Sequence, residues 1–473
     1  MTHKDGLDTS QQKVKDECGV IAVHAPEAGK LAVLGLHALQ HRGQESAGVA
    51  TFDGAVHLHK AMGLVESVFA CDPSLPGSWA IGHNRYSTTG SSTAVNAGPF
   101  EVASRFGPLV LAHNGNILNA PILRGWLADS FNLTLHSDSD SEVLALLLSV
   151  APGDSWIERL QWMADRVIGS YSLVLLAGDR LIGVRDPMGN RPLAMGRIAE
   201  GWVLASESCA FSLLGGIPVR DVQPGEVVEI GQDGPIPGGW LTPARHAFCA
   251  FEHIYIARPD TLFAGRAVHA VRRAIGEELG REHPAPADLV IGVPDSGTSA
   301  ALGFSTSTGI PFGEGLIKNR YVGRTFIQPA QAERERLIRM KFGALPLKGK
   351  RIALVDDSIV RGNTLRPIVA LVREAGASEV HVRVASPPLT DPCYLGVDMA
   401  RKDELIANRM GEDELAAHTT ADSLRHISVD GLLRAIRGTR DDTCLACFTG
   451  RYPPAVQAAL PARAEAEEME MAR

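Results

Sequence analysis

The sequence predicts two domains of different fold class: a first half of the α+β class and a second half of the α/β class with a parallel sheet. Three observations support this prediction. The chain has 473 residues, which is more than one ordinary hydrophobic core accommodates. Short strand-like runs crowd the first half. In the second half, longer apolar strands alternate with a helix, as parallel sheets require.

Four runs in the first half have the composition of strands, and Gly-, Ser- and Asn-rich loops separate them. They are GVIAVHA (19–25), AGVATFD (47–53), SYSLVLLAG (170–178) and WVLASE (202–207). Helices are expected near 28–40 and near 141–150. QPGEVVEI (223–230) closes this half, and GGWLTPARHAFCAFEHIY (238–255) is expected to bridge the two halves.

The second half contains a strand, helix, strand order. DLVIGV (288–293) and RIALVDD (351–357) are apolar enough to be buried strands. LRPIVALVREAGA (365–377) has apolar residues at helical spacing, a proline in its first turn and a glycine near its end. EVHVRVAS (379–386) then alternates as a strand does. This order predicts parallel strands.

Composition excludes several functions. Hydrophobic residues make up 45% of the chain and charged residues 21%, as in ordinary globular enzymes, and the net charge of −8 argues against a nucleic-acid partner. No apolar run is long enough for a membrane helix. The leader MTHKDGLDTSQQKVKDE (1–17) carries seven charged residues and no apolar core, so it is not a secretory signal. We therefore expect a cytoplasmic protein without a membrane partner.

VDDSIVRGNT (355–364) has the features of a phosphate-binding loop. An apolar strand ends at two adjacent aspartates, and a short loop then opens a helix, whose N-terminal N–H groups and dipole favour phosphate. The aspartates could hold a ribose diol or Mg²⁺. A simpler interpretation is that one aspartate only caps the helix. The polar residues and the glycine of this loop are Asp356, Asp357, Ser358, Arg361, Gly362 and Thr364.

This stretch resembles the loop with which type I phosphoribosyltransferases bind 5-phosphoribosyl 1-pyrophosphate (PRPP). The resemblance implies that Asp356 and Asp357 contact the ribose hydroxyls and Mg²⁺, and that the loop holds the 5-phosphate. VPDSGTSA (293–300) matches the pyrophosphate loop, which adds Ser296 to the expected Mg²⁺ site. KNRYVGRTFIQP (318–329) resembles the flexible loop of that family. Its basic residues, which would fold over PRPP or simply face solvent, are Lys318, Arg320 and Arg324.

Five motifs occur in order in the first half: CGVIAVH (18–24), LQHRGQESAG (39–48), GHNRYSTTG (82–90), AHNGNI (112–117) and SDSE (139–142). Together they resemble the glutaminase domain of N-terminal-nucleophile amidotransferases. The resemblance implies an αββα sandwich that hydrolyses the glutamine carboxamide.

Amide hydrolysis needs a nucleophile, a base and an oxyanion site. The resemblance makes the Cys18 thiol the nucleophile. If Cys18 became the first residue, its α-amine would be the base, with a pKa near 8. Asn114 and Gly115 would form the oxyanion site. Arg85 would bind the substrate α-carboxylate and Asp140 the α-ammonium group. The alternative is that Cys18 is an ordinary buried thiol.

The seven cysteines include a CLAC pair at 444–447, which supplies half of the ligands of an iron–sulfur or zinc site. Cys249 in the bridge and Cys393 after SPPLTDP would complete it. This arrangement resembles the 4Fe–4S-containing, propeptide-bearing branch of the glutamine PRPP amidotransferase family, where the cluster is structural. Zinc or four unrelated thiols are the alternatives. Cys71 and Cys209 are expected to be ordinary buried thiols.

The resemblance spans residues 18 to about 455. It implies conversion of glutamine, PRPP and water to 5-phosphoribosylamine, glutamate and pyrophosphate, the first committed step of purine biosynthesis. It also implies inhibition by purine nucleotides and a homo-oligomer, often a tetramer. The alternatives are an amidotransferase with another synthase domain and a non-catalytic PRPP-binding regulator.

The expected division of the chain follows from the same resemblance. Residues 1–17 would be a propeptide removed by self-processing at Glu17–Cys18, because only cleavage frees the α-amine of Cys18. Residues 18–240 would form the glutaminase domain, 241–455 the phosphoribosyltransferase domain with the bridge and cluster, and 456–473 a C-terminal tail.

Overall fold

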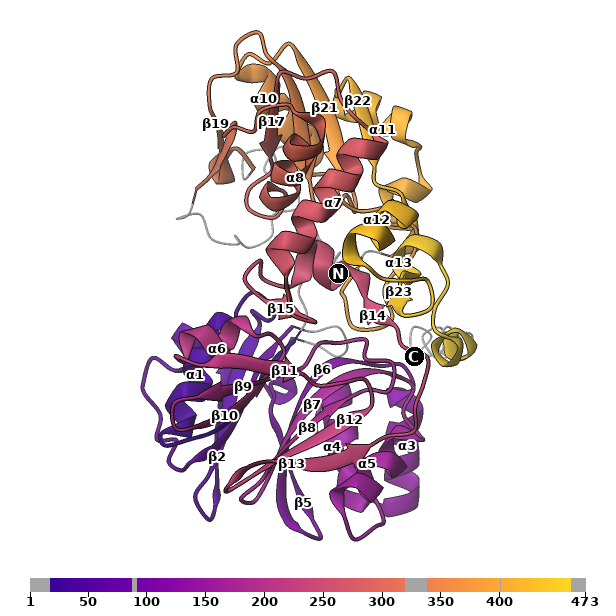
Figure 1. Ribbon diagram of the computed structural model, residues 1–473. Helices are drawn as coiled ribbons and strands as arrows, with labels where there is room; N and C mark the ends of the chain where they lie inside the picture. The colour runs from indigo at the N-terminus through magenta and orange to yellow at the C-terminus, as the bar shows by residue number, and fades with distance from the viewer. Residues whose placement is uncertain (1–17, 87–91, 320–337, 400, 461–473) are drawn as a thin grey trace, which may run out of the picture.

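The computed structural model describes residues 18–86, 92–319, 338–399 and 401–460, and it contains two domains that pack against each other (Figure 1). The predicted propeptide 1–17 lies outside the described residues, as does most of the predicted C-terminal tail. Within the described part of the chain, every helix is too short or too polar to span a bilayer.

The first domain contains two sheets in which all neighbouring strands are antiparallel. The first sheet consists, in spatial order, of β11 (Ile217–Asp221), β9 (Ala194–Ile198), β10 (Gly201–Ala205), β1 (Gly19–His24), β4 (Trp79–Arg85), β2 (Ser46–Phe52) and β3 (Val56–Met62). The second consists of β13 (Gly234–Trp240), β12 (Glu226–Gly231), β8 (Leu181–Arg185), β7 (Gly169–Ala177), β6 (Gly107–Ile117) and β5 (Phe100–Ser104).

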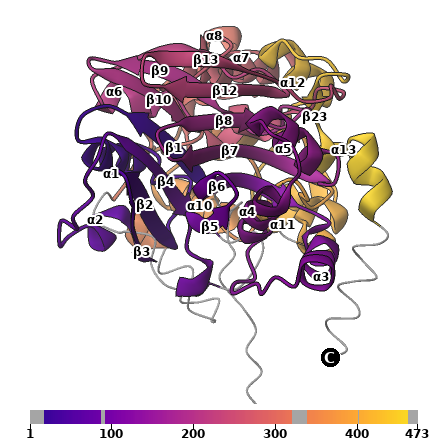
Figure 2. The ribbon, with the colours of Figure 1, turned by 90° about the horizontal axis from the view of Figure 1, so that it is seen from below.

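The two sheets face each other across an apolar core. Val20 and Ile81 of the first sheet pack there with Val110 and Val174 of the second. Helices cover the outer faces: α1 (Ala28–Ala38), α2 (Val65–Val68) and α6 (Cys209–Leu213) on the first sheet, and α3 (Ala120–Phe131), α4 (Asp140–Val150) and α5 (Trp156–Ala164) on the second. In Figure 2, α1 lies beside β4 and α4 beside β6. The expected αββα sandwich is confirmed.

The second domain is built on the parallel sheet β17 (Leu289–Gly292), β20 (Arg351–Asp356), β21 (Glu379–Val384) and β22 (Ser423–His426). Side chains alternate between the faces of β20. Ala353 and Val355 face α7 (Val268–Glu282) and α8 (Thr298–Thr308), whereas Ile352 and Leu354 face α10 (Leu365–Glu374) and α11 (Glu412–Thr419). The predicted parallel sheet and the helix after its second strand are both confirmed.

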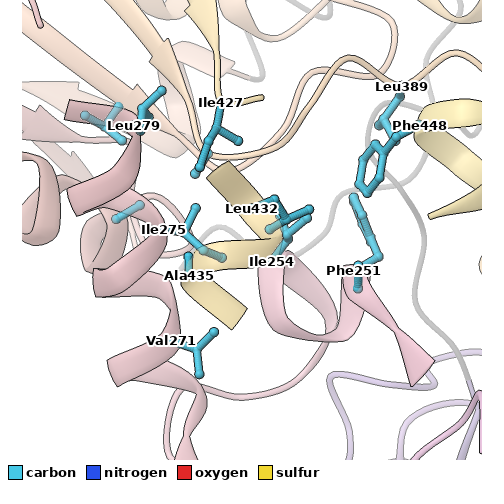
Figure 3. Close-up of a cluster of buried hydrophobic side chains, with 14 of the residues drawn as sticks. Phe251, Ile254, Val271, Ile275, Leu279, Leu389, Ile427, Leu432, Ala435 and Phe448 are labelled. Carbon is cyan, nitrogen blue, oxygen red and sulfur yellow. The ribbon is translucent and has the colours of Figure 1, made fainter. Parts of the chain in front are cut away.

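Residues 238–240 of the predicted bridge are the end of β13, and the rest of it connects the two domains and contacts the C-terminal segment. Here β14 (Phe248–Cys249) pairs in parallel with β23 (Thr443–Cys444). Figure 3 shows Phe251 against Phe448, and Ile254, from η2 (Glu252–Ile256), beside Leu432 of α12 (Val429–Ile436). The remaining elements are η1 (Ala94–Asn96), β15 (Leu262–Phe263), β16 (Arg266–Ala267), β18 (Leu316–Lys318), β19 (Phe342–Ala344), η3 (Lys402–Glu404), η4 (Ile406–Asn408) and α13 (Ala446–Thr449).

Candidate functional site

Cys18 lies directly before β1, the central strand of the first sheet. Its Sγ donates a hydrogen bond to the carbonyl oxygen of Tyr86 at 3.5 Å. Burial raises the pKa of the Cys18 thiol to about 11, and the nearby Arg85 and Asp140 shift it in opposite directions. The thiol is therefore protonated near neutral pH, so it needs a base before it can act as a nucleophile.

Arg85 and Asp140 are the opposite charges beside this thiol. Arg85 ends β4 and Asp140 begins α4. Asp140 Oδ2 accepts a hydrogen bond from the Ile117 N–H at 3.1 Å, and Asp140 Oδ1 lies 3.8 Å from His113 Nδ1. Burial raises the pKa of Asp140, but His113, the Ile117 N–H and Arg85 together hold it below its ordinary value. The structure thus places a cation and an anion close to the Cys18 thiol.

Asn114 and Gly115 lie next to each other in β6, on the second sheet. Asn114 Nδ2 donates to Ser206 Oγ at 3.5 Å, and the same oxygen accepts from the Val20 N–H at 3.0 Å. Ser206 therefore links Asn114 to the strand that follows Cys18. Gly115 has a φ of +151°, and a Cβ there would lie 2.0 Å from the carbonyl oxygen of Ser170. Only glycine fits this position.

A buried charge network beneath Cys18 was not predicted. Arg42 donates to Cys18 O at 3.2 Å and to Glu207 Oε1 at 2.5 Å. It also donates to both carboxylate oxygens of Glu252, at 2.7 and 3.1 Å. Arg42 belongs to the motif LQHRGQESAG, so the sequence did contain a signal that this residue takes part in the site. Glu207 and Glu252 are its partners only in the folded chain.

The predicted phosphate loop begins where β20 ends. The Asp357 N–H donates to Asp356 Oδ1 at 2.9 Å, and Ser358 Oγ donates to Asp357 Oδ1 at 2.5 Å. Both aspartates are buried. The N-cap residue of α10 is Thr364, and its side chain accepts no capping hydrogen bond. Neither aspartate occupies the cap position, which disfavours the alternative that an aspartate only caps this helix. Gly362, with a φ of +72°, allows the turn.

The predicted pyrophosphate loop, which contains Ser296, lies at the same edge of the sheet. Gly292 of β17 is in register with Val355 of β20, so both strands end side by side. A Cβ on Gly297 would lie 2.5 Å from the Val355 carbonyl oxygen, which shows how closely the loop packs on β20. Ligands of open parallel sheets bind at this carboxyl edge.

Two basic residues of the expected PRPP site are in the described part of the chain. Lys318 Nζ donates to Asp295 Oδ2 at 2.5 Å, which joins β18 to the pyrophosphate loop. Arg361 donates to Glu404 Oε2 at 2.8 Å. Arg320 and Arg324 lie outside the described residues, so their predicted contacts stay predictions.

The four cysteines of the expected cluster come to one region. Cys249 and Cys444 are partners in the parallel pair β14–β23, and the 390–391 backbone donates to the Cys447 carbonyl oxygen at 3.0 and 3.2 Å. Burial raises the pKa of the Cys447 thiol, and the other three cysteines raise it further. As they stand, the described residues contain no group of three or more His, Cys, Asp or Glu side chains arranged to hold a metal ion.

Cys71 and Cys209 are the two cysteines outside the expected cluster. Cys71 is exposed and Cys209 is buried. Burial and the nearby Glu207 raise the pKa of the Cys209 thiol. Cys209 agrees with the prediction of an ordinary buried thiol, whereas the prediction of burial is wrong for Cys71, whose side chain faces solvent.

Comparison with known proteins places this geometry in a family. Residues 83–212 match a family model described as a glutamine amidotransferase domain. The amidophosphoribosyltransferase of Synechococcus elongatus is 48% identical over 93% of this chain and 92% of its own length. That of Drosophila melanogaster is 45% identical over 92% of this chain and 89% of its own.

Solved structures agree. The glutamine PRPP amidotransferase of B. subtilis, complexed with ADP and GMP, superimposes with a TM-score of 0.86 at 42% identity, covering 92% of this chain and 97% of that one. A structure described as the allosteric regulatory enzyme of purine biosynthesis gives 0.85, also at 42% identity. The chain belongs to the amidophosphoribosyltransferase family, the enzymes of glutamine-dependent PRPP amidotransfer in purine biosynthesis.

Proposed function

We propose that this chain divides the reaction of its family between its two domains. Glutamine is hydrolysed beside Cys18, and the ammonia then displaces pyrophosphate from PRPP beside Asp356 and Asp357 to give 5-phosphoribosylamine. The observation that carries the proposal is the coexistence of two sites in one chain: a cysteine between an arginine and an aspartate, and an acidic loop at the carboxyl edge of a parallel sheet.

In the first site, Cys18 attacks the glutamine carboxamide and forms a thioester, which water resolves. Arg85 and Asp140 bind the α-carboxylate and α-ammonium groups of glutamine, and Asn114 and Gly115 bind the oxyanion. The raised pKa of the Cys18 thiol supports the need for a base next to it. We assign that role to the α-amine of Cys18 after cleavage.

In the second site, the 356–364 loop binds the 5-phosphate and the ribose hydroxyls of PRPP. Carboxylate oxygens are ligands that Mg²⁺ prefers, and the packing of the 293–300 loop, with Ser296, against the end of β20 supports a site for the ion beside Asp356 and Asp357. Bound Mg²⁺ would neutralise charge on the departing pyrophosphate. Lys318, Arg324 and Arg361 would contact PRPP. Ammonia has to reach this site unprotonated, so water must be kept from its path.

The proposal is tested by the dependence of one half-reaction on the substrate of the other. We expect purified protein to hydrolyse glutamine much faster with PRPP than without it, and to release one pyrophosphate per glutamate. Glutamine hydrolysis at the same rate with and without PRPP, and without release of pyrophosphate, would overturn the proposal. It would instead favour an amidotransferase with a different synthase partner. If the protein shows neither glutamine hydrolysis nor pyrophosphate release, the result would favour a PRPP-binding regulator.

We also propose that Cys249, Cys393, Cys444 and Cys447 hold a 4Fe–4S cluster. The chemistry of the donor set supports the proposal, because four thiols from three segments lie in one region, and four neighbouring thiolates without a cation would repel one another. The described side chains are not arranged around an ion as they stand, so binding of the cluster would have to draw the four sulfur atoms together. The cluster would tie the C-terminal segment to the bridge and take no part in the chemistry.

Metal analysis tests this proposal. Protein purified without oxygen is expected to be brown and to contain about four irons and four sulfides per chain. Cys444→Ser should lose most of the iron and the thermal stability, because the C-terminal segment is then released from the bridge. Cys71→Ser is the matched control, since Cys71 is exposed and lies in the first domain. Colourless wild-type protein that contains zinc would reject the cluster.

A further prediction concerns the leader. Cleavage at Glu17–Cys18 creates the catalytic amine and thiol together, so we expect the active protein to begin at Cys18. Mass spectrometry of the purified enzyme measures this directly. A chain expressed with Met directly before Cys18 should be active as soon as its methionine is removed. Full glutamine-dependent activity in a protein that still begins at Met1 would show that the assignment of the base is wrong.

The remaining features of the family are extended to this chain as proposals. Nucleotides in the B. subtilis structure support feedback inhibition by purine nucleotides. We also propose a homo-oligomer, of which the tetramer implied by the resemblance is the expected form, and a cytoplasmic location. The domain limits near residues 240 and 455 are kept as proposals of the same kind.

A further inference from the structure

One carboxylate of the bridge contacts two buried arginines of the glutaminase domain. Glu252 begins η2, and its side chain is fully buried. Arg42 donates to its two oxygens at 2.7 and 3.1 Å, and the guanidinium of Arg191 lies 3.6 Å from Oε1. Both arginines are also fully buried. Burial raises the pKa of Glu252, but Arg42 and Arg191 hold it below its ordinary value.

The first arginine, Arg42, contacts Cys18, the proposed nucleophile. Arg42 uses Nε to donate to the carbonyl oxygen of Cys18 at 3.2 Å. This bond fixes the peptide unit that follows the thiol-bearing residue. The position of Cys18 therefore depends on how Arg42 is held, and Glu252 accepts two of the hydrogen bonds that hold it.

The second arginine, Arg191, is connected to β6, the strand that carries the proposed oxyanion residues Asn114 and Gly115. Arg191 Nε donates to the carbonyl oxygen of Leu395 at 2.8 Å, and Ser170 Oγ donates to the same oxygen at 2.8 Å. Asn116 Nδ2 donates to the Tyr394 carbonyl oxygen at 2.9 Å. A Cβ on Gly396 would lie only 3.0 Å from the carbonyl carbon of Gly115. The 394–396 loop of the second domain is therefore packed directly onto the oxyanion residue.

We infer that Glu252 is a positioning residue for glutamine hydrolysis: its carboxylate, from the bridge, holds Arg42 against Cys18 and Arg191 against the 394–396 loop over Gly115. The inference rests on the proposed roles of Cys18 and Gly115. It assigns part of the glutaminase site to segments outside the glutaminase motifs. The nucleophile and the oxyanion strand belong to different sheets, and this carboxylate is a common support for both.

The electrostatics explain why one residue can do this. Charge-assisted hydrogen bonds in a buried site are strong and directional. Glutamine in place of Glu252 keeps the size of the side chain but removes the negative charge and one acceptor. Both guanidinium groups would then shift toward their other partners. Displacement of a reacting group by about 1 Å can lower a rate by about a hundredfold.

The test compares Glu252→Gln with the wild-type enzyme, purified as the complete metal-loaded chain. We expect kcat with glutamine to fall by roughly tenfold to a hundredfold. KM for glutamine should change by less than about threefold, because Arg85 and Asp140 bind the substrate independently. Synthesis from ammonia, which does not use Cys18, should stay within about twofold of wild type. This separation distinguishes positioning from a general loss of structure.

A second variant and a control keep the test decisive. Ser170→Ala removes one hydrogen bond to Leu395 and no charge, so it should fold even if Glu252→Gln does not, and it should also lower kcat with glutamine. Glu282→Gln is the control, because Glu282 pairs with Arg434 and Ser428 inside the second domain. Its glutamine and ammonia activities should both stay near wild type.

Two results would overturn the inference. One is wild-type kcat with glutamine in both Glu252→Gln and Ser170→Ala. The other is an equal loss of the glutamine and ammonia activities together with a lower melting temperature, which would mean a structural role only. Failure of the proposed function gives a different result, since the wild-type enzyme itself would then form no pyrophosphate from glutamine and PRPP.

Discussion

Cys18→Ser is expected to abolish the use of glutamine and to leave synthesis from ammonia intact. A serine hydroxyl ionises far less readily than a thiol, and burial at this position already raises the pKa of the thiol to about 11. The glutamine-dependent rate should fall by at least about a thousandfold, as when other enzymes lose their nucleophile. PRPP binding is unaffected because the 356–364 loop belongs to the other domain.

Pyrophosphate release measures both activities in the same preparation. Glutamine is tested at neutral pH and ammonium salts at raised pH, where more of the ammonia is unprotonated. Cys71→Ser serves as the control for replacing a cysteine and should match the wild type, because Cys71 is exposed. Loss of the ammonia-dependent activity in Cys18→Ser would contradict the division of the reaction between two sites.

Asp357→Ala is expected to remove both activities that depend on PRPP. The carboxylate is buried at the end of β20 and accepts a hydrogen bond from Ser358. Loss of a group that orients PRPP and its metal ion should lower the rate by about a hundredfold to a thousandfold with either nitrogen donor. The fold should persist, because Asp357 follows the last residue of β20 and belongs to none of the strands of the sheet.

Asp288→Asn is the matched control for this change. Asp288 pairs with Arg351 at the opposite end of the same strand pair, at 2.7 Å, and both side chains are exposed. It should therefore retain wild-type rates with glutamine and with ammonia. Circular dichroism and the melting temperature confirm folding of both variants. An Asp357→Ala enzyme that keeps half of its ammonia-dependent rate would exclude this loop as the PRPP site.

The sequence predicted best those segments in which the residue types and the spacing of the apolar residues indicate the same element. The run RIALVDD became β20, and LRPIVALVREAGA became α10 with slightly closer limits. We did not predict α7, although Val268, Val271, Ile275 and Leu279 stand at helical spacing. Two arginines and two glutamates stand between these four residues and make the segment polar as a whole, so its apolar face is clear only against the sheet.

Contacts between distant segments were beyond local prediction. Arg42 and Glu252 are 210 positions apart, and neither has a neighbour in sequence that reveals the other. Burial of both charges is favourable only because they meet, and the meeting depends on the packing of both domains. Ser206 escaped prediction for the same reason, since it acts by joining two strands that lie in different sheets.

The 394–396 loop makes the proposed glutaminase site depend on a segment that is synthesised after the glutaminase domain. Domains fold from the N-terminus as the chain leaves the ribosome, and the glutaminase motifs emerge long before Leu395 and Gly396. A nascent chain that ends before this loop cannot form the bonds from Ser170 and Arg191 to Leu395. Strand β6, with the proposed oxyanion residues Asn114 and Gly115, then lacks its cover while the proposed PRPP site is incomplete. We therefore expect a chain that ends before Leu395 to hydrolyse glutamine more slowly than the complete chain.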